Sequence, residues 1–311
     1  MQAILSSAVL PLLIVLSLAT SAAAQPPGPP PGPPRAPAPL PAGTKVLKDL
    51  AYVEGGHERQ KLDLYLPPAG SKRPLVVSIH GGAFRVGSKD GEPVQTAGAL
   101  LARGFAVAAI NYRLSQHAVF PAQIEDCKAA VRWLRANASR HGYDPDRIAS
   151  FGASAGGHLA AMLGTAGDVR AFDVGAHPGV SSRVQAVVDF FGPTDFLQMD
   201  AHRPNAQAMI HDTPDSPESQ LVGGPIRDNE DKVARANPLT YVTKDDPPFL
   251  IVHGDADLLV PHHQSVLLDE ALRRAGVPVR FVTIPGGPHG GATVTEGLPT
   301  ALDFLAQTLR P

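Results

Sequence analysis

The stretch Gly152-Ala153-Ser154-Ala155-Gly156 decides the fold of this chain, because of what lies on either side of it. Residues 147–151 are typical of a short buried strand, and residues 156–163 are typical of a helix. A serine flanked by small residues between a strand and a helix predicts a nucleophile elbow. In that turn the hydroxyl stands above the end of the sheet, over the free N–H groups of the helix. A glycine-rich turn with a purely structural role is the alternative.

Two loops further along the chain carry the base and the acid that a serine nucleophile needs. A serine hydroxyl becomes reactive when a base takes its proton and an acid holds that base in one tautomer. An apolar strand runs into Asp255 and Asp257, and a later β-branched strand runs into a loop with His289. Loops that follow parallel strands meet at one edge of the sheet. We therefore expect Ser154, Asp257 and His289 to be nucleophile, acid and base. Asp255 is the alternative acid, although it can bond to its own backbone in the turn.

An early strand, residues 75–79, leads directly into His80-Gly81-Gly82. Adjacent glycines let backbone N–H groups approach a developing oxyanion with no Cβ in the way. We expect the N–H of Gly81 or Gly82 to form part of an oxyanion hole. A merely flexible turn at these glycines is the alternative.

Strands and helices alternate along most of the chain, which predicts an α/β fold with a mostly parallel central sheet and helices on both faces. The expected strands span residues 45–53 and 60–66 (an antiparallel opening pair), 75–79, 105–110, 147–151, 184–191, 249–252 and 279–284, and the expected helices span 94–103, 121–139, 264–275 and 299–309 besides the elbow helix. Between residues 196 and 236 the pattern stops. An insertion of this length in a compact domain is typical of a lid or binding loop, so we expect a lid-like segment over Ser154.

Composition limits the class of protein. The 311 residues are 43% hydrophobic and 18% charged, enough for one sizeable α/β core. A net charge of −2 gives no reason to expect nucleic acid or a specific membrane partner. No Cys/His cluster has zinc spacing, so we expect no metal and no cofactor. The lone Cys127 lies on one helix face with Val131 and Leu134, where it should be a small buried apolar residue.

The N-terminal segment predicts export. Residues 4–18 form an apolar stretch that ends in the small-residue pattern Ser21-Ala22-Ala23-Ala24, typical of a signal peptide spanning residues 1–24. Residues 25–44 should be a Pro-rich extended linker, followed by a catalytic domain over residues 45–311. We therefore expect a secreted or periplasmic protein, with an uncleaved anchor as the alternative.

Further motifs occur in a fixed order along the chain: His80-Gly81-Gly82, the elbow at Ser154, Phe191-Gly192-Pro193-Thr194-Asp195, His253-Gly254-Asp255-Ala256-Asp257 and Pro288-His289-Gly290. With them the chain resembles the α/β-hydrolase esterases that have a His-Gly-Gly loop, in particular the BD-FAE-like group of bifunctional acetylxylan and feruloyl esterases.

This resemblance implies an α/β-hydrolase fold and a cofactor-free serine esterase that works through an acyl-enzyme. It also implies that the N–H of Ala155 completes the oxyanion hole together with that of Gly81 or Gly82. It implies acetyl or aryl (feruloyl-type) esters of polysaccharides or small molecules as substrates. An arylformamidase-like amidase or a dipeptidyl-peptidase-like hydrolase with the same triad is the alternative enzyme. A catalytically inactive binding module is a third possibility from a different class.

Overall fold

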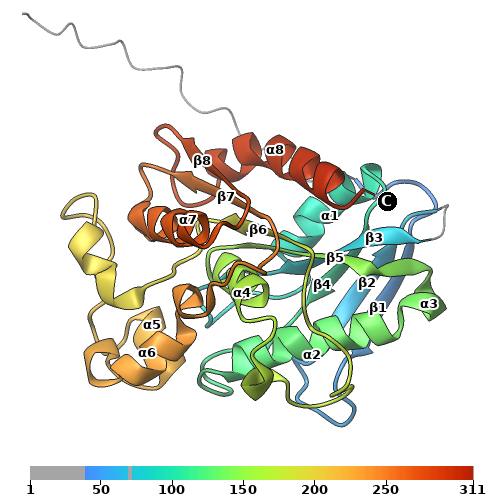
Figure 1. Ribbon diagram of the computed structural model, residues 1–311, viewed down its shortest axis with the longest axis horizontal. Helices are drawn as coiled ribbons and strands as arrows, with labels where there is room; N and C mark the ends of the chain where they lie inside the picture. The colour runs from blue at the N-terminus through green and yellow to red at the C-terminus, as the bar shows by residue number, and fades with distance from the viewer. Residues whose placement is uncertain (1–38, 69–71, 311) are drawn as a thin grey trace, which may run out of the picture. The chain divides into compact units, whose positions relative to one another are not determined.

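The computed structural model describes residues 39–68 and 72–310 (Figure 1). Its strands are β1 (Lys45–Ala51), β2 (Lys61–Leu66), β3 (Arg73–Ile79), β4 (Ala106–Ile110), β5 (Tyr143–Ala153), β6 (Ala186–Phe190), β7 (Phe249–Gly254) and β8 (Val279–Ile284). They form one sheet in the order β1-β2-β4-β3-β5-β6-β7-β8. β2 pairs antiparallel with β1 and β4, and every later pair of neighbours is parallel. The expected mostly parallel sheet with an antiparallel opening pair is confirmed.

Helices cover both faces of this sheet. They are α1 (Glu92–Ala102), α2 (Ala122–Ala136), α3 (Ala138–His141), α4 (Ala155–Thr165), α5 (Pro217–Val222), α6 (Glu230–Ala236), α7 (His263–Ala275) and α8 (Ala292–Thr308). Side chains of α1 and α8 pack in the core on one face, and those of α2, α4 and α7 pack in the core on the other. Figure 1 shows α8 and α2 on opposite sides of the strands.

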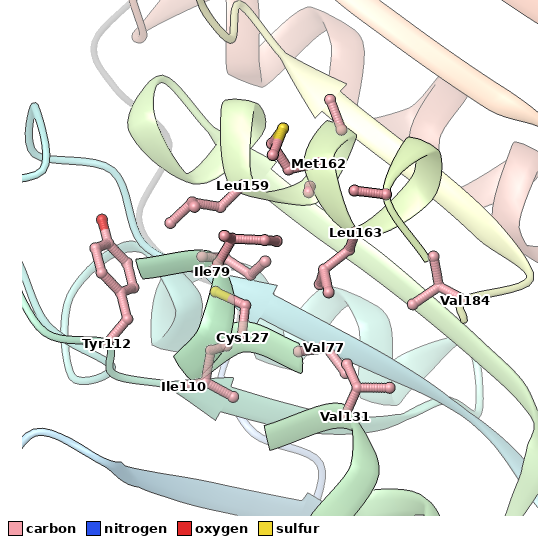
Figure 2. Close-up of a cluster of buried hydrophobic side chains, with 14 of the residues drawn as sticks. Val77, Ile79, Ile110, Tyr112, Cys127, Val131, Leu159, Met162, Leu163 and Val184 are labelled. Atoms are coloured by element: carbon pink, nitrogen blue, oxygen red, sulfur yellow. The ribbon is translucent and has the colours of Figure 1, made fainter. Parts of the chain in front are cut away.

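Alternation along the strands separates the two cores. Successive strand side chains point to opposite faces, so Val77 and Ile79 of β3 face α2 and α4, whereas Val76 faces α1 and α8. Figure 2 shows the first of these cores, where Cys127 lies among apolar neighbours. Its side chain is fully buried, as its place on the helix face predicted.

The last helix begins earlier than the sequence indicated. The expected start was Pro299, but α8 starts at Ala292 and contains Pro299 inside it. Its first turns pack closely on the sheet. A Cβ on Gly297 would come within 2.6 Å of Val252 and 2.7 Å of Phe190. Tertiary packing therefore extends the helix by seven residues on the N-terminal side of the expected start.

The segment 196–236 also differs from its expected irregular character, since it contains α5, α6 and several single turns of 3₁₀ helix. Helix α5 has ordinary end signals: the Ser216 hydroxyl accepts the N–H of Ser219, Pro217 follows the cap, and Gly223 ends the helix in a left-handed conformation. Helices of six or seven residues are too short to show an amphipathic period in sequence.

The expected signal peptide at residues 1–24 lies outside the described residues, as does most of the expected linker at 25–44. Within residues 39–68 and 72–310, no helix combines the length and the apolar character needed to cross a bilayer.

Candidate active site

Ser154 occupies the sharp turn between β5 and α4. Its φ of 56° and ψ of −124° are unusual for a residue with a side chain. Its N–H donates to the carbonyl of Phe190 at 2.9 Å, which fixes the turn to β6. A Cβ on Gly152 would lie 2.1 Å from the carbonyl oxygen of Gly156, and a Cβ on Gly156 would lie 2.2 Å from that of Ile79. The glycines that flank the serine are therefore required by close backbone contacts.

Asp257 and His289 meet in the loops that follow β7 and β8. The Nδ1–H of His289 donates to Oδ2 of Asp257 at 2.7 Å. The other oxygen, Oδ1, accepts the N–H groups of Leu259 at 2.8 Å and Val260 at 2.9 Å. With Nδ1 donating to a carboxylate, the Nε2 atom of His289 is free to accept a proton.

Electrostatics keep this acid charged. Asp257 is buried, and burial acts to raise the pKa of its carboxyl group, but hydrogen bonds from His253 and His289 outweigh it and hold the pKa well below its ordinary value. The alternative acid, Asp255, is exposed in the turn and accepts the N–H of Gly286 at 2.6 Å. The geometry therefore favours Asp257 as the partner of the base.

A second imidazole on Asp257 was not singled out from the sequence. His253, the penultimate residue of β7, is fully buried, with its Nε2 3.2 Å from Oδ2 of Asp257 and 3.0 Å from the carbonyl of Val260. Both partners are acceptors, so Nε2 carries the proton and Nδ1 accepts the hydroxyl of Ser265 at 2.7 Å. A polar residue at the end of an otherwise apolar strand was the available signal.

The His-Gly-Gly loop follows β3 and lies beside the elbow. The N–H of Gly81 donates to Oε2 of Glu92 at 2.9 Å, so it is not free to bind an oxyanion. Gly82 has a φ of +104°, and a Cβ there would lie 2.3 Å from the carbonyl of Val86. Across the described residues, the N–H groups of Gly82 and Ala155 have no hydrogen-bond acceptor. Of the expected donors Gly81, Gly82 and Ala155, the geometry therefore leaves the last two available.

His80 is a rigid, uncharged support for this loop. Its ring stacks on Tyr112 at a centroid distance of 4.3 Å, and its carbonyl accepts the Tyr112 hydroxyl at 3.0 Å. Burial lowers the pKa of His80 to about 4, so the ring is neutral near pH 7. The loop is thus held from beneath by an aromatic stack.

Ser154 and His289 open into the same pocket, which has a volume of about 70 Å³. Its lining is mostly apolar and comes from the His-Gly-Gly loop, the elbow, the 196–236 segment and the loops after β6, β7 and β8: Ala83, Phe84, Ser154, Ala155, Pro193, Met209, His211, Pro217, Glu218, Leu259, Val260 and His289. The 196–236 segment contributes Met209, His211, Pro217 and Glu218, so it forms part of the pocket wall.

A larger cavity of about 270 Å³ lies at the opposite end of α4, with Thr165, Arg183 and Tyr241 in its walls. None of Ser154, Asp257 and His289 lines it. In the part of the chain that the structure describes, no group of three or more His, Cys, Asp or Glu side chains is arranged to hold a metal ion.

The BD-FAE family model matches residues 62–272. The chain belongs to the BD-FAE family. The matched region runs from β2 into α7 and includes Ser154 and Asp257, while His289 lies beyond it. The resemblance drawn from the sequence motifs is confirmed.

A mycobacterial ester hydrolase supports this family assignment. A probable carboxylic ester hydrolase, LipM, of Mycobacterium tuberculosis is 33% identical over 269 residues, which is 83% of this chain and 60% of the relative. The chain thus spans less than two thirds of that relative's length.

Two solved structures share the fold. A truncated carbohydrate esterase from gut microbiota has a TM-score of 0.78 and 34% identity, over 87% of this chain and 99% of that chain. A bifunctional GH43-CE protein of Bacteroides eggerthii has a TM-score of 0.78 and 39% identity, over 85% of this chain and 38% of that chain. The fold is that of the α/β-hydrolases.

Proposed function

We propose that this chain is a serine esterase that removes small acyl groups, chiefly acetyl, from carbohydrate esters. The observation that carries the proposal is the 2.7 Å hydrogen bond between Asp257 and His289, in a histidine that shares a small pocket with the serine of a strained elbow. A buried carboxylate, an oriented imidazole and a hydroxyl that opens into the pocket are the parts that nucleophilic acyl transfer needs.

In the proposed reaction His289 moves the protons, and the backbone N–H groups bind the negative charge that develops. His289 takes the hydroxyl proton of Ser154 through Nε2 while the serine oxygen attacks the ester carbonyl. The N–H groups of Gly82 and Ala155 bind the oxyanion of the tetrahedral intermediate. The imidazolium, stabilised by Asp257, then protonates the leaving alcohol. Water repeats the sequence on the acyl-enzyme and releases the acid.

The size of the pocket supports a small acyl group. A volume of about 70 Å³ is several times smaller than the 300–1,000 Å³ or so of pockets that enclose drug-sized ligands. This volume suits an acetyl group better than the aromatic feruloyl group. Similarity to a carbohydrate esterase and to a bifunctional GH43-CE protein supports a sugar as the alcohol. The N-terminal sequence pattern supports export, which N-terminal sequencing of the mature protein would test.

A panel of substrates tests this function. We expect hydrolysis of p-nitrophenyl acetate and acetylated xylan, slower hydrolysis of p-nitrophenyl butyrate, and little of methyl ferulate. Ser154→Ala should lower turnover by several powers of ten, since such losses in serine hydrolases reach about 10⁶. Circular dichroism should show that the variant stays folded. Full activity of Ser154→Ala, or a clear preference for an aryl amide over every ester, would overturn the proposal.

A further inference from the structure

One charged pair in the pocket wall has no part in the acyl-transfer chemistry. His211 and Glu218, both from the 196–236 segment, line the pocket with Ser154 and His289. The Nδ1 atom of His211 lies 2.9 Å from Oε2 of Glu218. Their side chains are only 2% and 4% exposed. Burying two ionisable groups costs free energy even when they are paired. A buried pair in the wall of the pocket that holds Ser154 is therefore a candidate for a role in substrate binding.

The hydrogen bonds of His211 define its protonation. Its Nε2 lies 2.9 Å from the carbonyl of Leu259, which can only accept, so Nε2 carries a proton. Nδ1 faces the carboxylate of Glu218, another acceptor, so the ring donates from both nitrogens. Burial lowers the pKa of His211, but the hydrogen bond and charge of Glu218 outweigh it and raise the pKa. Through Nδ1, His211 thus holds Glu218 in one orientation.

Glu218 keeps one oxygen for another partner. Its Oε2 atom takes the bond from His211, whereas Oε1 accepts no hydrogen bond within the described residues. Oε1 is also not fully enclosed by protein atoms, so a ligand can reach it. In a residue that lines the pocket, this oxygen is an anchored, charged acceptor open to whatever enters. Such an acceptor matches a hydroxyl or N–H donor.

We propose that Glu218, oriented by His211, accepts a hydrogen bond from a free hydroxyl of the substrate. This inference rests on the proposed esterase function and deepens it. An acetyl group carries no donor, so the hydroxyl must belong to the alcohol part of the ester. The enzyme would therefore select partially acetylated carbohydrates in which a free hydroxyl neighbours the acetyl ester.

Selection for a substrate with the free hydroxyl should be strong. A substrate that fills the pocket without offering a hydroxyl leaves Oε1 of Glu218 cut off from water and without a partner, and this cost falls only on substrates that lack the hydroxyl. Sites built to bond a substrate hydroxyl reject the analogue without it far more strongly than apolar pockets reject a missing methylene. We expect roughly tenfold to hundredfold discrimination.

A matched pair of substrates tests the inference. One is a methyl xyloside with a single acetyl ester and a free neighbouring hydroxyl, and the other carries a methyl ether in place of that hydroxyl. The wild-type enzyme should show a kcat/KM at least about tenfold higher on the first. Glu218→Gln should reduce this ratio to about threefold or less. Glu230→Gln, an exposed change in α6 of the same segment, should keep the wild-type ratio.

The outcomes separate the two levels of the proposal. A wild-type ratio within twofold of one overturns the role of Glu218 without the need for any variant, so the test stands even if Glu218→Gln does not fold. A large ratio that survives Glu218→Gln also overturns it. Failure to hydrolyse either xyloside, with p-nitrophenyl acetate still cleaved, overturns the carbohydrate substrate itself.

Discussion

Replacing Gly156 by alanine tests how the elbow and the oxyanion loop are held together. Gly156 lies in the first turn of α4, and its Cα faces the end of β3 just before the His-Gly-Gly loop. An added Cβ would lie 2.2 Å from the carbonyl oxygen of Ile79 and 2.8 Å from that of His80. Both contacts are with backbone atoms, which cannot rotate away as a flexible side chain could.

The size of the effect follows from these distances. Comfortable contacts between a carbon and a carbonyl oxygen lie near 3.3 Å or beyond, so α4 and the end of β3 must separate by about 1 Å. Ala155 moves with the helix and Gly82 with the loop, so the two candidate oxyanion donors move apart. A misplacement of about 1 Å can cost about 10²-fold in rate. Overpacking of this kind typically costs about 1–3 kcal/mol in stability.

The assay compares kcat/KM on p-nitrophenyl acetate with thermal unfolding of the same samples. Gly179→Ala is the matched control, because Gly179 is exposed and a Cβ there would meet no atom within 4 Å. We expect Gly156→Ala to lose about 10²-fold in kcat/KM while still folding, and the control to match the wild type. A folded Gly156→Ala variant with kcat/KM within twofold of the wild type would refute the reasoning.

Three further predictions follow from the site and the core. Asp257→Asn should lower kcat on p-nitrophenyl acetate by about 10⁴, because the imidazole loses its orienting carboxylate, whereas the exposed Asp255→Asn should cost less than about tenfold; equal losses in steady-state assays would contradict this choice of acid. Burial lowers the pKa of His158 to about 4, below its value of about 6.5 when unfolded, so the unfolded chain takes up the proton first. The free energy of unfolding in urea should therefore fall by up to about 3 kcal/mol as pH drops from 6.5 to 4. His158→Gln should flatten this pH dependence, and an unchanged slope in the variant would contradict the role given to His158. Chelation with EDTA should leave kcat unchanged, because the proposed reaction uses only side chains and backbone groups of the chain; activity lost on chelation and restored by zinc would contradict that reaction.

Sequence was most informative where the signal is local. Apolar runs mark the strands, and Ser154, Asp257 and His289 could be predicted as neighbours because each follows a strand of the same parallel sheet. The sharp turn at the serine also follows from its small neighbours. These features depend on a few consecutive residues, so one chain is enough to predict them.

Sequence was least informative where a side chain from one element meets another. The bond from Gly81 to Glu92 joins the loop after β3 to the start of α1, and no local pattern marks it. The pairing of His211 with Glu218 depends on the path of the 196–236 segment, whose helices are too short to be predicted from sequence periodicity. Such contacts are set by tertiary packing, which adds no regular spacing to the sequence.

The position of β8, the strand before the His289 loop, has a consequence for how the protein would lose activity on heating. β8 is one of the two edge strands of the sheet. Among the described residues it pairs with β7 alone, and of its own six residues only Ile284 is buried. Edge strands with little buried surface open at lower free energy than central ones. On warming, the histidine should leave its carboxylate while β3, β5 and β6 still hold the serine in place. Heat inactivation would then begin as a local, reversible fraying, visible as fast amide hydrogen exchange in β8 well below the temperature at which the sheet melts.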